Sequence, residues 1–255
     1  MGRKHQSGPI ANPKWVATFG AMKSMILGCA GLLALTNVQL LAVETPVLQT
    51  ESGIPLDAPW KVAVFQFAKS NLQHSAWGLA HAERDFQLAT TLAEQEKLTV
   101  DLDVLFAAAF LHDMGVFEPY PKEGVDHTER AAQVAGATLQ PAGFPMEKFP
   151  QVQTAMRSHM FYSAVNDSAE ARVLHDADTL DFLGMIGVTR ILSVTSRHRW
   201  ANTLPDAIAT LEKFKRELPG KLVTDSAKKQ AAARISEMEQ FLSALKAETH
   251  AGRAL

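Results

Sequence analysis

The segment from Leu102 to Asp113 constrains the fold more than any other part of the sequence. Its residues 104–111 read Val-Leu-Phe-Ala-Ala-Ala-Phe-Leu, which shows no alternation of polar and apolar side chains. Asp101 or Thr99 can cap a helix at its start. A helix that is apolar on nearly every side is stable only where other elements cover it. We therefore expect this helix to be buried on most sides.

Helical periodicity continues over most of the sequence from Pro59 onward. Short breaks at Pro and Gly interrupt it, and few alternating β-branched runs compete with it. The stretch from Gly115 to Asp126 contains two prolines and is expected to be a surface loop. The expected helices cover residues 60–72, 76–98, 102–113, 128–140, 146–160, 168–182, 184–198, 204–217 and 225–247. The sequence therefore predicts an all-α fold.

Charge and cysteine content limit the classes of partner and site. The 255 residues carry 25 basic and 27 acidic side chains, for a net charge of −2. No large field attracts nucleic acid or an anionic membrane, and we expect neither as a partner of the folded part. Only one cysteine, Cys29, is present beside nine histidines. Any metal site must therefore use histidines and carboxylates rather than thiolates.

The first 45 residues differ from the rest of the chain. Basic residues precede an uncharged apolar stretch from Ser24 to Val43, and a polar segment follows it. This order is typical of a secretory signal peptide, with Met22 as an alternative start and a cleavage point after Ala42. We expect residues 1–45 to be such a signal, and the mature protein to be periplasmic or secreted. An uncleaved membrane anchor, and an apolar N-terminal helix packed on a cytoplasmic domain, stay open as alternatives.

Two ionisable residues, His112 and Asp113, end the apolar helix just before Gly115. Burying such a pair costs free energy unless a partner neutralises it. A divalent cation would do so, with the imidazole nitrogen and the carboxylate oxygen as ligands. Taken alone, the pair also fits a hydrogen-bonded helix end without any metal.

Two further segments give this pair a recognisable context. His81 begins the sequence His-Ala-Glu-Arg within the expected helix 76–98, and Asp178 lies in the sequence Asp-Ala-Asp-Thr-Leu-Asp. Together with Phe-Leu-His-Asp-Met-Gly around His112, these segments resemble the H…HD…D order of the HD superfamily. The resemblance covers residues 75–190, and the segments look like those of small bacterial HD hydrolases. It implies an HD-domain helical bundle over 46–255, with a metal site between central helices and further helices at the C-terminus.

The resemblance also implies the metal ligands, which are His81, His112, Asp113 and Asp178. Asp176 and Asp181 compete for the last position, but an Ala-Asp-x-Leu pattern favours Asp178. On the same helix Asp176 would point about 200° away from it. His175 and Asp176 form a second His-Asp pair, which we do not expect to bind metal.

HD proteins with two metal ions use additional histidines that follow the His-Asp pair. His127 and His159 lie in this interval, so the resemblance implies a second site made by these histidines and a bridging Asp113. Helix capping and a solvated helix end are the alternatives for the two histidines. The cofactor would be one or two divalent ions, and Mn, Fe, Co, Ni and Zn all remain open.

The family resemblance implies a small phosphorylated substrate, with a nucleotide favoured, that a metal-activated water hydrolyses. Asp113 would then be catalytic, and a phosphate would need positive partners beyond the metal. Arg84 and Lys122 are predicted to be catalytic and to bind substrate, and Arg157 and Arg190 are further substrate-binding candidates. A solvated salt bridge is the alternative for each of these side chains.

Other functions stay open at this stage. Some HD relatives hydrate small nitrile-like molecules such as cyanamide, and others hold a di-iron pair and oxidise C–H bonds. A binding module without turnover is a third alternative. Val116 stands where some HD phosphodiesterases have a lysine, and no GYP-type signature follows, which disfavours a cyclic dinucleotide phosphodiesterase. The expected helix 225–247 could serve as a homodimer face or could cover the core.

Overall fold

The computed structural model describes residues 48–255, so the predicted leader, residues 1–45, lies outside the described residues. Within residues 48–255 the secondary structure consists of α-helices and short 3-10 helices, without a β-strand. The predicted all-α fold is confirmed. None of the helices in this range has both the length and the apolar character that crossing a bilayer requires.

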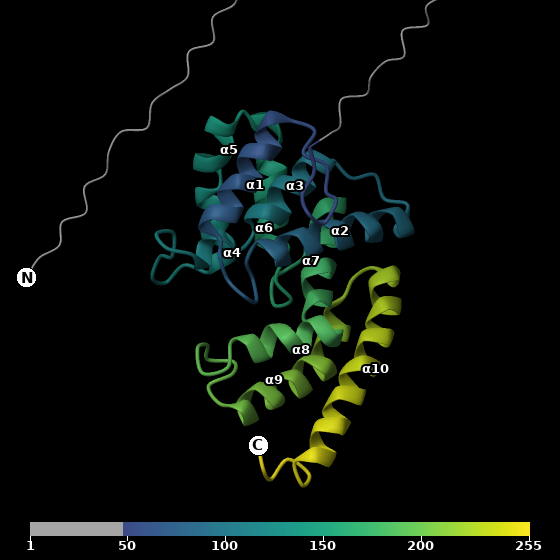
Figure 1. The fold of residues 1–255 in the computed structure, drawn as a ribbon. Coiled ribbons are helices and arrows are strands. Elements are labelled where there is room, and N and C mark those ends of the chain that lie inside the picture. The colour runs from purple at the N-terminus through teal and green to yellow at the C-terminus, as the bar shows by residue number, and fades with distance from the viewer. Residues whose placement is uncertain (1–47) are drawn as a thin grey trace, which may run out of the picture. The chain divides into compact units, whose positions relative to one another are not determined.

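The helices follow the predicted order closely (Figure 1). The α-helices are α1 (Pro59–Asn71), α2 (Leu79–Glu96), α3 (Leu102–Leu111), α4 (His127–Val134), α5 (Gly136–Ala142), α6 (Phe149–Ser158), α7 (Ala169–Asp181), α8 (Gly184–Ser193), α9 (Leu204–Glu217) and α10 (Asp225–Glu248). The 3-10 helices are η1 (Met114–Val116), η2 (Met146–Lys148) and η3 (Leu218–Lys221).

Helix α3 lies at the centre of the upper group of helices, where α1, α2 and α6 pack against it (Figure 1). Every residue from Val104 to Leu111 is buried. The Asp101 side chain caps the helix by accepting hydrogen bonds from the next backbone N–H groups. Phe106 and Phe110 stack with their ring centroids 4.2 Å apart. The prediction that this helix is buried on most sides is therefore confirmed.

Helices α2 and α7 cross beside α3 and pack extensively against each other. Residues 173–181 of α7 are all buried, polar side chains included. This crossing brings His81 on α2 close to Asp178 on α7, although nearly 100 residues separate them in the sequence. The fold thus brings together the four ligands predicted for the first site from α2, α7 and the turn after α3.

The predicted helix over 128–140 is divided into α4 and α5. The chain bends near Gly136, where an added Cβ would lie 3.2 Å from the Phe149 ring. The bend lets α5 pack against α1 while α4 packs against α6. Ala135 keeps helical backbone angles at this point, so the hydrophobic periodicity alone does not reveal the bend.

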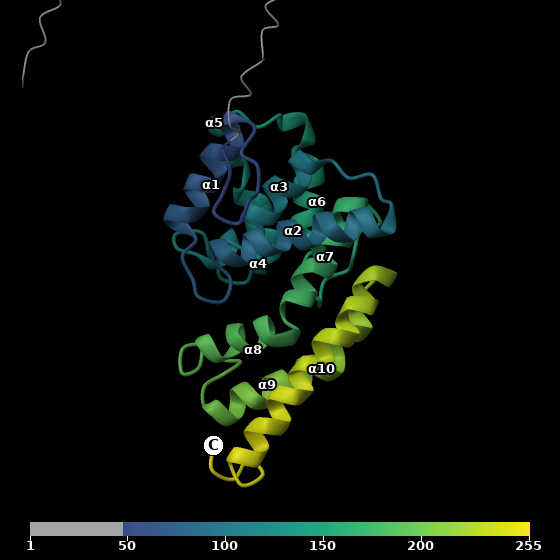
Figure 2. The same ribbon diagram turned by 45° about the vertical axis from the view of Figure 1, so that its right-hand side comes forward.

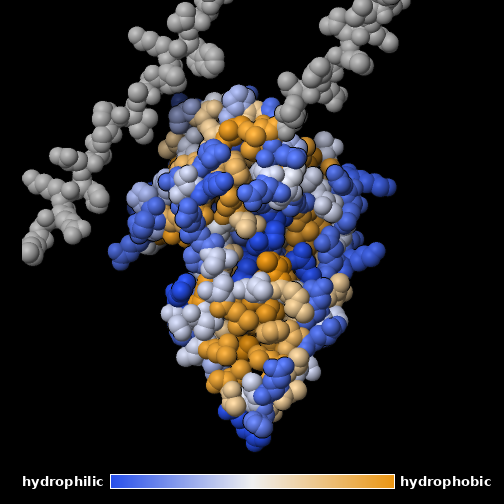
Figure 3. All heavy atoms as spheres, in the orientation of Figure 1, coloured by the Kyte–Doolittle hydropathy of each residue, from blue (hydrophilic) through white to orange (hydrophobic). Residues whose placement is uncertain are grey.

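Helices α8, α9 and α10 form a second group that continues from the end of α7 (Figures 1 and 2). The long helix α10 packs against α8, α9, α7 and α2. Its buried side chains include Ala231, Met238 and Leu242. The helix therefore covers the core, one of the two roles predicted for it. Figure 3 shows apolar side chains gathered over this lower group, beneath a hydrophilic band in the middle of the same face.

Replacing Phe106 by alanine should lower the free energy of unfolding by about 3–5 kcal/mol, because the ring is fully buried and its loss leaves a cavity. Urea denaturation followed by circular dichroism measures this change. Leu102→Ala, on the same helix but 48% exposed, is the control and should cost less than about 1 kcal/mol. Equal losses in both variants would contradict the central position of α3.

Candidate metal centre

His81 lies near the start of α2 and is buried. Its Nδ1 atom lies 2.7 Å from the Asp181 Oδ2 atom on α7, and this hydrogen bond fixes the orientation of the ring. The opposite atom, Nε2, lies 3.3 Å from Asp178 Oδ1 and 3.2 Å from His112 Nε2. The first of the predicted ligands therefore faces two of the others.

His112 and His159 are held in the same way as His81. The Nδ1 atom of His112 lies 2.8 Å from the Ala109 carbonyl oxygen, and that of His159 lies 2.6 Å from the Met156 carbonyl oxygen. A carbonyl oxygen only accepts hydrogen bonds, so Nδ1 carries the proton in both rings. In the neutral tautomer the Nε2 lone pair is then free. All three rings direct this atom toward one centre, an arrangement typical of metal-binding histidines.

Asp113 lies between two groups of histidines. Its Oδ2 atom lies 3.4 Å from His112 Nε2 and 3.6 Å from His81 Nε2. Its Oδ1 atom lies 3.5 Å from His127 Nε2 and 3.7 Å from His159 Nε2. Each carboxylate oxygen therefore faces one of the two predicted sites, as a bridging ligand would require.

The donor atoms fit a divalent cation in both spacing and unmet bonding capacity. Ligands bound at about 2.0–2.2 Å lie roughly 3 to 3.5 Å from one another around the ion, close to the spacings found here. The buried atoms His159 Nε2 and Asp178 Oδ2 have no hydrogen-bond partner within residues 48–255. Buried polar atoms are nearly always satisfied in folded proteins, so such atoms indicate a missing partner.

The charge balance of the centre also favours a cation. Among the carboxylates of Asp85, Asp113, Asp178 and Asp181, ion pairs with guanidinium groups within residues 48–255 are formed by Asp181, with Arg84 and Arg190. Two negative charges are left for histidine protons or a divalent ion to neutralise. Burial and Arg190 lower the pKa of His81, but nearby carboxylates, Asp85 first, outweigh them and raise it to about 10. Metal binding at His81 would therefore displace a proton.

Asp181 supports the centre from outside it. It accepts two hydrogen bonds from Arg84, each 2.8 Å long, and forms an ion pair of 3.0 Å with Arg190. Because Asp181 also holds His81, these arginines stabilise the carboxylate that orients the ring. Burial raises the pKa of Asp181, and the two arginines and His81 together lower it far below its usual range.

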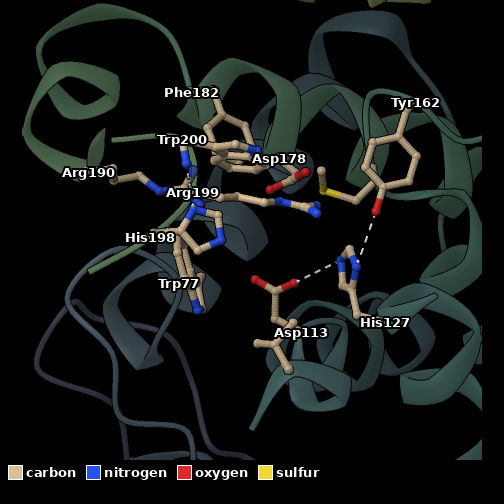
Figure 4. A pocket seen from close by; sticks show the side chains of 12 residues that line it. Trp77, Asp113, His127, Tyr162, Asp178, Phe182, Arg190, His198, Arg199 and Trp200 are labelled. Carbon is tan, nitrogen blue, oxygen red and sulfur yellow. Dashed lines mark hydrogen bonds and ion pairs between the residues drawn. The ribbon is translucent and has the colours of Figure 1, made fainter. Parts of the chain in front are cut away.

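We call the six predicted metal ligands the donor cluster; they are His81, His112, Asp113, His127, His159 and Asp178. A cavity of about 140 Å³ opens beside this cluster (Figure 4). Asp113, His127 and Asp178 line it on the side of the candidate metal ligands. The remaining lining residues are Trp77, Val116, Met160, Tyr162, Phe182, Arg190, His198, Arg199 and Trp200. Figure 4 shows the His127 ring between Asp113 and the Tyr162 hydroxyl, and the Arg199 side chain extending into the cavity.

Only one of the four predicted basic residues lines this cavity. Arg190 does so, although its guanidinium donates to the Ala76 carbonyl oxygen and lies 4.1 Å from the centre of the Phe182 ring. Arg84 lines a different hollow, between α2 and α10, because Asp181 holds it there.

Lys122 is exposed in the loop after the His-Asp pair, and Arg157 pairs on the surface with Glu129 at 2.6 Å. The geometry does not support the predicted substrate contacts of Arg84, Lys122 and Arg157. Of these, Arg84 positions Asp181 instead.

Sequence reasoning did not place Arg199, His198 and Tyr162 at the cavity. It also missed the aromatic wall of the cavity, which is formed by Trp77, Phe182 and Trp200. We predicted a helix as far as residue 198, but α8 ends at Ser193 and Ser196 has a positive φ of 65°. The chain therefore turns back and brings residues 198–200 of the Arg-His-Arg-Trp run at 197–200 to the cavity. The concentration of basic and aromatic side chains in this run was the available signal.

The second His-Asp pair makes hydrogen bonds to other segments of the chain. His175 lies between the carbonyl oxygens of Ser158 and Lys221, at 2.9 and 3.0 Å. Asp176 accepts hydrogen bonds from residues at the start of α10. Neither side chain belongs to the donor cluster, and Asp178 rather than Asp176 faces His81.

Residues 78–183 match the family model described as the HD domain. The chain is similar to the crystal structure of Bacillus subtilis YpgQ in complex with ADP. The match covers 74% of this chain and 97% of YpgQ, with 23% identity and a TM-score of 0.56. A predicted HD superfamily hydrolase from an uncultured Thermotogales bacterium is similar over 74% of this chain and 90% of that protein, with 26% identity and a TM-score of 0.50.

An HD-superfamily hydrolase from Bacillus thuringiensis shows 22% identity over 75% of this chain and 95% of that protein, with a TM-score of 0.54. No curated protein matches the sequence. Residues 78–183 therefore match the HD domain, and the predicted resemblance to the HD superfamily is confirmed.

His127→Ala should reduce the bound metal from two ions per chain to one, because it removes a donor of the second site and leaves the first intact. Elemental analysis after dialysis against Mn²⁺ measures the ratio. His74→Ala is the control, since this ring stacks on Trp77 outside the donor cluster. Unchanged metal content in His127→Ala would remove His127 from the metal shell.

Proposed function

We propose that this protein is a metal-dependent phosphohydrolase that acts on a nucleotide or another phosphate ester or anhydride. The observation that carries this proposal is the convergence of the buried Nε2 atoms of three histidines on Asp113 and Asp178 beside a cavity. Each imidazole is already oriented by its Nδ1 hydrogen bond, so binding costs little further ordering. The proposed cofactor is one or two divalent ions.

The proposed roles divide the donor cluster into two sets. His81, His112, Asp113 and Asp178 would hold the first ion, and Asp113, His127 and His159 the second. A bound ion supplies an activated water near neutral pH and offsets charge that develops on a phosphoryl oxygen. Tyr162 donates to Asp126 and contacts His127 Nδ1 at 3.2 Å. This contact keeps the His127 ring turned toward Asp113.

Arg199 is the side chain best placed to bind a phosphate. It extends into the cavity and forms no ion pair within residues 48–255, whereas Arg84, Arg157 and Arg190 are each bound to a carboxylate (Figure 4). A guanidinium presents paired N–H donors that match phosphate oxygens. Arg199 therefore takes the role that we first predicted for Arg84 and Lys122.

The aromatic wall supports a nucleotide as the substrate. Trp77 and Trp200 line the cavity beside Arg199, and base rings stack favourably on indoles. A volume of about 140 Å³ accommodates a phosphoryl group but is smaller than most pockets that enclose a whole small molecule. The nucleoside would therefore lie along the indoles at the cavity mouth. The same fold in YpgQ binds ADP in its crystal structure.

We propose a small phosphorylated substrate as the binding partner of this site. A periplasmic or secreted location stays a prediction that rests on the leader, and a homodimer stays a proposal. If the leader directs export, scavenging of extracellular phosphate compounds fits the site better than control of a cytosolic nucleotide pool.

Phosphate release from a panel of nucleotides, with the full chain and added Mn²⁺, tests the proposed chemistry. Release should require both the metal and Asp113, so Asp113→Ala should be inactive while it retains its helical signal. A metal-loaded wild-type protein that releases no phosphate would contradict the proposal. Cyanamide hydration and oxygen uptake, measured on the same sample, would then identify the alternative chemistry.

Arg199→Ala should lower kcat/KM by roughly 10- to 100-fold, because a charge-assisted hydrogen bond contributes about 1.5–3 kcal/mol. Its metal content should not change. Arg197→Ala is the matched control, since Arg197 is exposed and does not line the cavity. Equal kinetics in the two variants would rule out Arg199 as the phosphate contact.

A further inference from the structure

Asp85 is a buried acid that the proposed ligand sets do not use. It lies on α2, one turn after His81, and its side chain is fully buried. Neither of its carboxylate oxygens has a hydrogen-bond partner within residues 48–255. An isolated buried carboxylate is costly in free energy unless a positive group compensates it.

Two buried acids of the neighbouring helix α7 show how buried carboxylates are normally satisfied. Asp176 is equally buried, and it accepts from the Val223 N–H, the Thr224 N–H and the Thr224 hydroxyl at 2.9, 2.8 and 2.6 Å. Asp181 accepts hydrogen bonds from Arg84, lies within hydrogen-bonding distance of His81 Nδ1 and forms an ion pair with Arg190. Asp85 has no comparable set of donors: it faces the His81 and His112 rings at 3.2 and 3.7 Å, and these compensate its charge only while they are protonated.

The position of Asp85 indicates what its partner is. Its Oδ2 atom lies 3.2 Å from His81 Nε2 and 3.7 Å from His112 Nε2, the two atoms that face the first metal site. One donor atom from each of His81, Asp85, His112 and Asp178 lies within 4.8 Å of the other three. The unpartnered carboxylate is therefore directed into the same centre as the proposed ligands.

We infer that Asp85 is an additional protein ligand of the first metal ion, beside His81, His112, Asp113 and Asp178. The inference rests on the metal centre of the proposed function but not on its substrate. Zinc is usually satisfied by four ligands, whereas Mn²⁺ accepts six and prefers oxygen donors. A third carboxylate therefore shifts the preference of this site from Zn²⁺ toward Mn²⁺ or Fe²⁺.

Asp85→Asn tests this role with the full chain, and Asp176→Asn is the matched control at an equally buried acid. Affinity for Mn²⁺ and Zn²⁺ is measured by calorimetry, and the urea midpoint is measured in EDTA. Asp85→Asn should lose at least tenfold in Mn²⁺ affinity and less in Zn²⁺ affinity. Its urea midpoint in EDTA should fall by less than that of Asp176→Asn, since the Asp85 carboxylate accepts no hydrogen bond and faces only imidazole rings.

Asp176→Asn should behave in the opposite way. Its urea midpoint should fall, because hydrogen bonds to the start of α10 are weakened, and its Mn²⁺ affinity should stay within twofold of the wild type. Asp85→Leu provides a second variant if the asparagine protein does not fold. Wild-type Mn²⁺ affinity in either folded Asp85 variant would overturn the inference. A wild-type protein that binds no divalent ion would instead overturn the metal centre itself.

Discussion

The hydrogen bond between His81 Nδ1 and Asp181, 2.7 Å long, links α2 to α7 at the point where the two helices cross. It orients the imidazole so that Nε2 faces the turn after α3, and it places a carboxylate where Arg84 and Arg190 can neutralise it. Without such an arrangement, four acids near the centre of a helical bundle would repel one another. The bundle can hold these four acids because Asp181 is paired with two arginines. The other three, Asp85, Asp113 and Asp178, lie beside the convergent histidines. A divalent ion would complete this balance.

Most of the fold could be predicted from the sequence because its helices are strongly periodic. The apolar run from Val104 to Leu111 required a buried helix, and the structure places it at the centre. The predicted helix boundaries were wrong where the backbone changes direction without a change in the residue pattern. The bend at Gly136 and the early end of α8 both lie in segments whose residues continue a helical pattern. Such changes depend on contacts, such as that of Gly136 with Phe149, which periodicity does not encode.

The donor cluster was easier to predict than the side of the cavity that would bind a substrate. His81, His112, Asp113 and Asp178 occur in an order that resembles the HD superfamily, and the structure brings all four together. The basic residues had no such order to guide the prediction, and proximity in sequence favoured Arg84, which pairs with Asp181 instead. Asp85 was missed because an acid at i+4 from a histidine is common on solvated helix faces. Its complete burial is visible only once α7 is packed against α2.

Anomalous diffraction from crystals of the full chain grown with Mn²⁺ would test the central claim most directly. The account predicts a strong anomalous peak bounded by the Nε2 atoms of His81 and His112 and by the carboxylates of Asp113 and Asp178. A second, weaker peak is expected between Asp113, His127 and His159. A fully ordered donor cluster without any anomalous peak, in crystals soaked at a saturating Mn²⁺ concentration, would contradict the assignment of these residues to a metal centre.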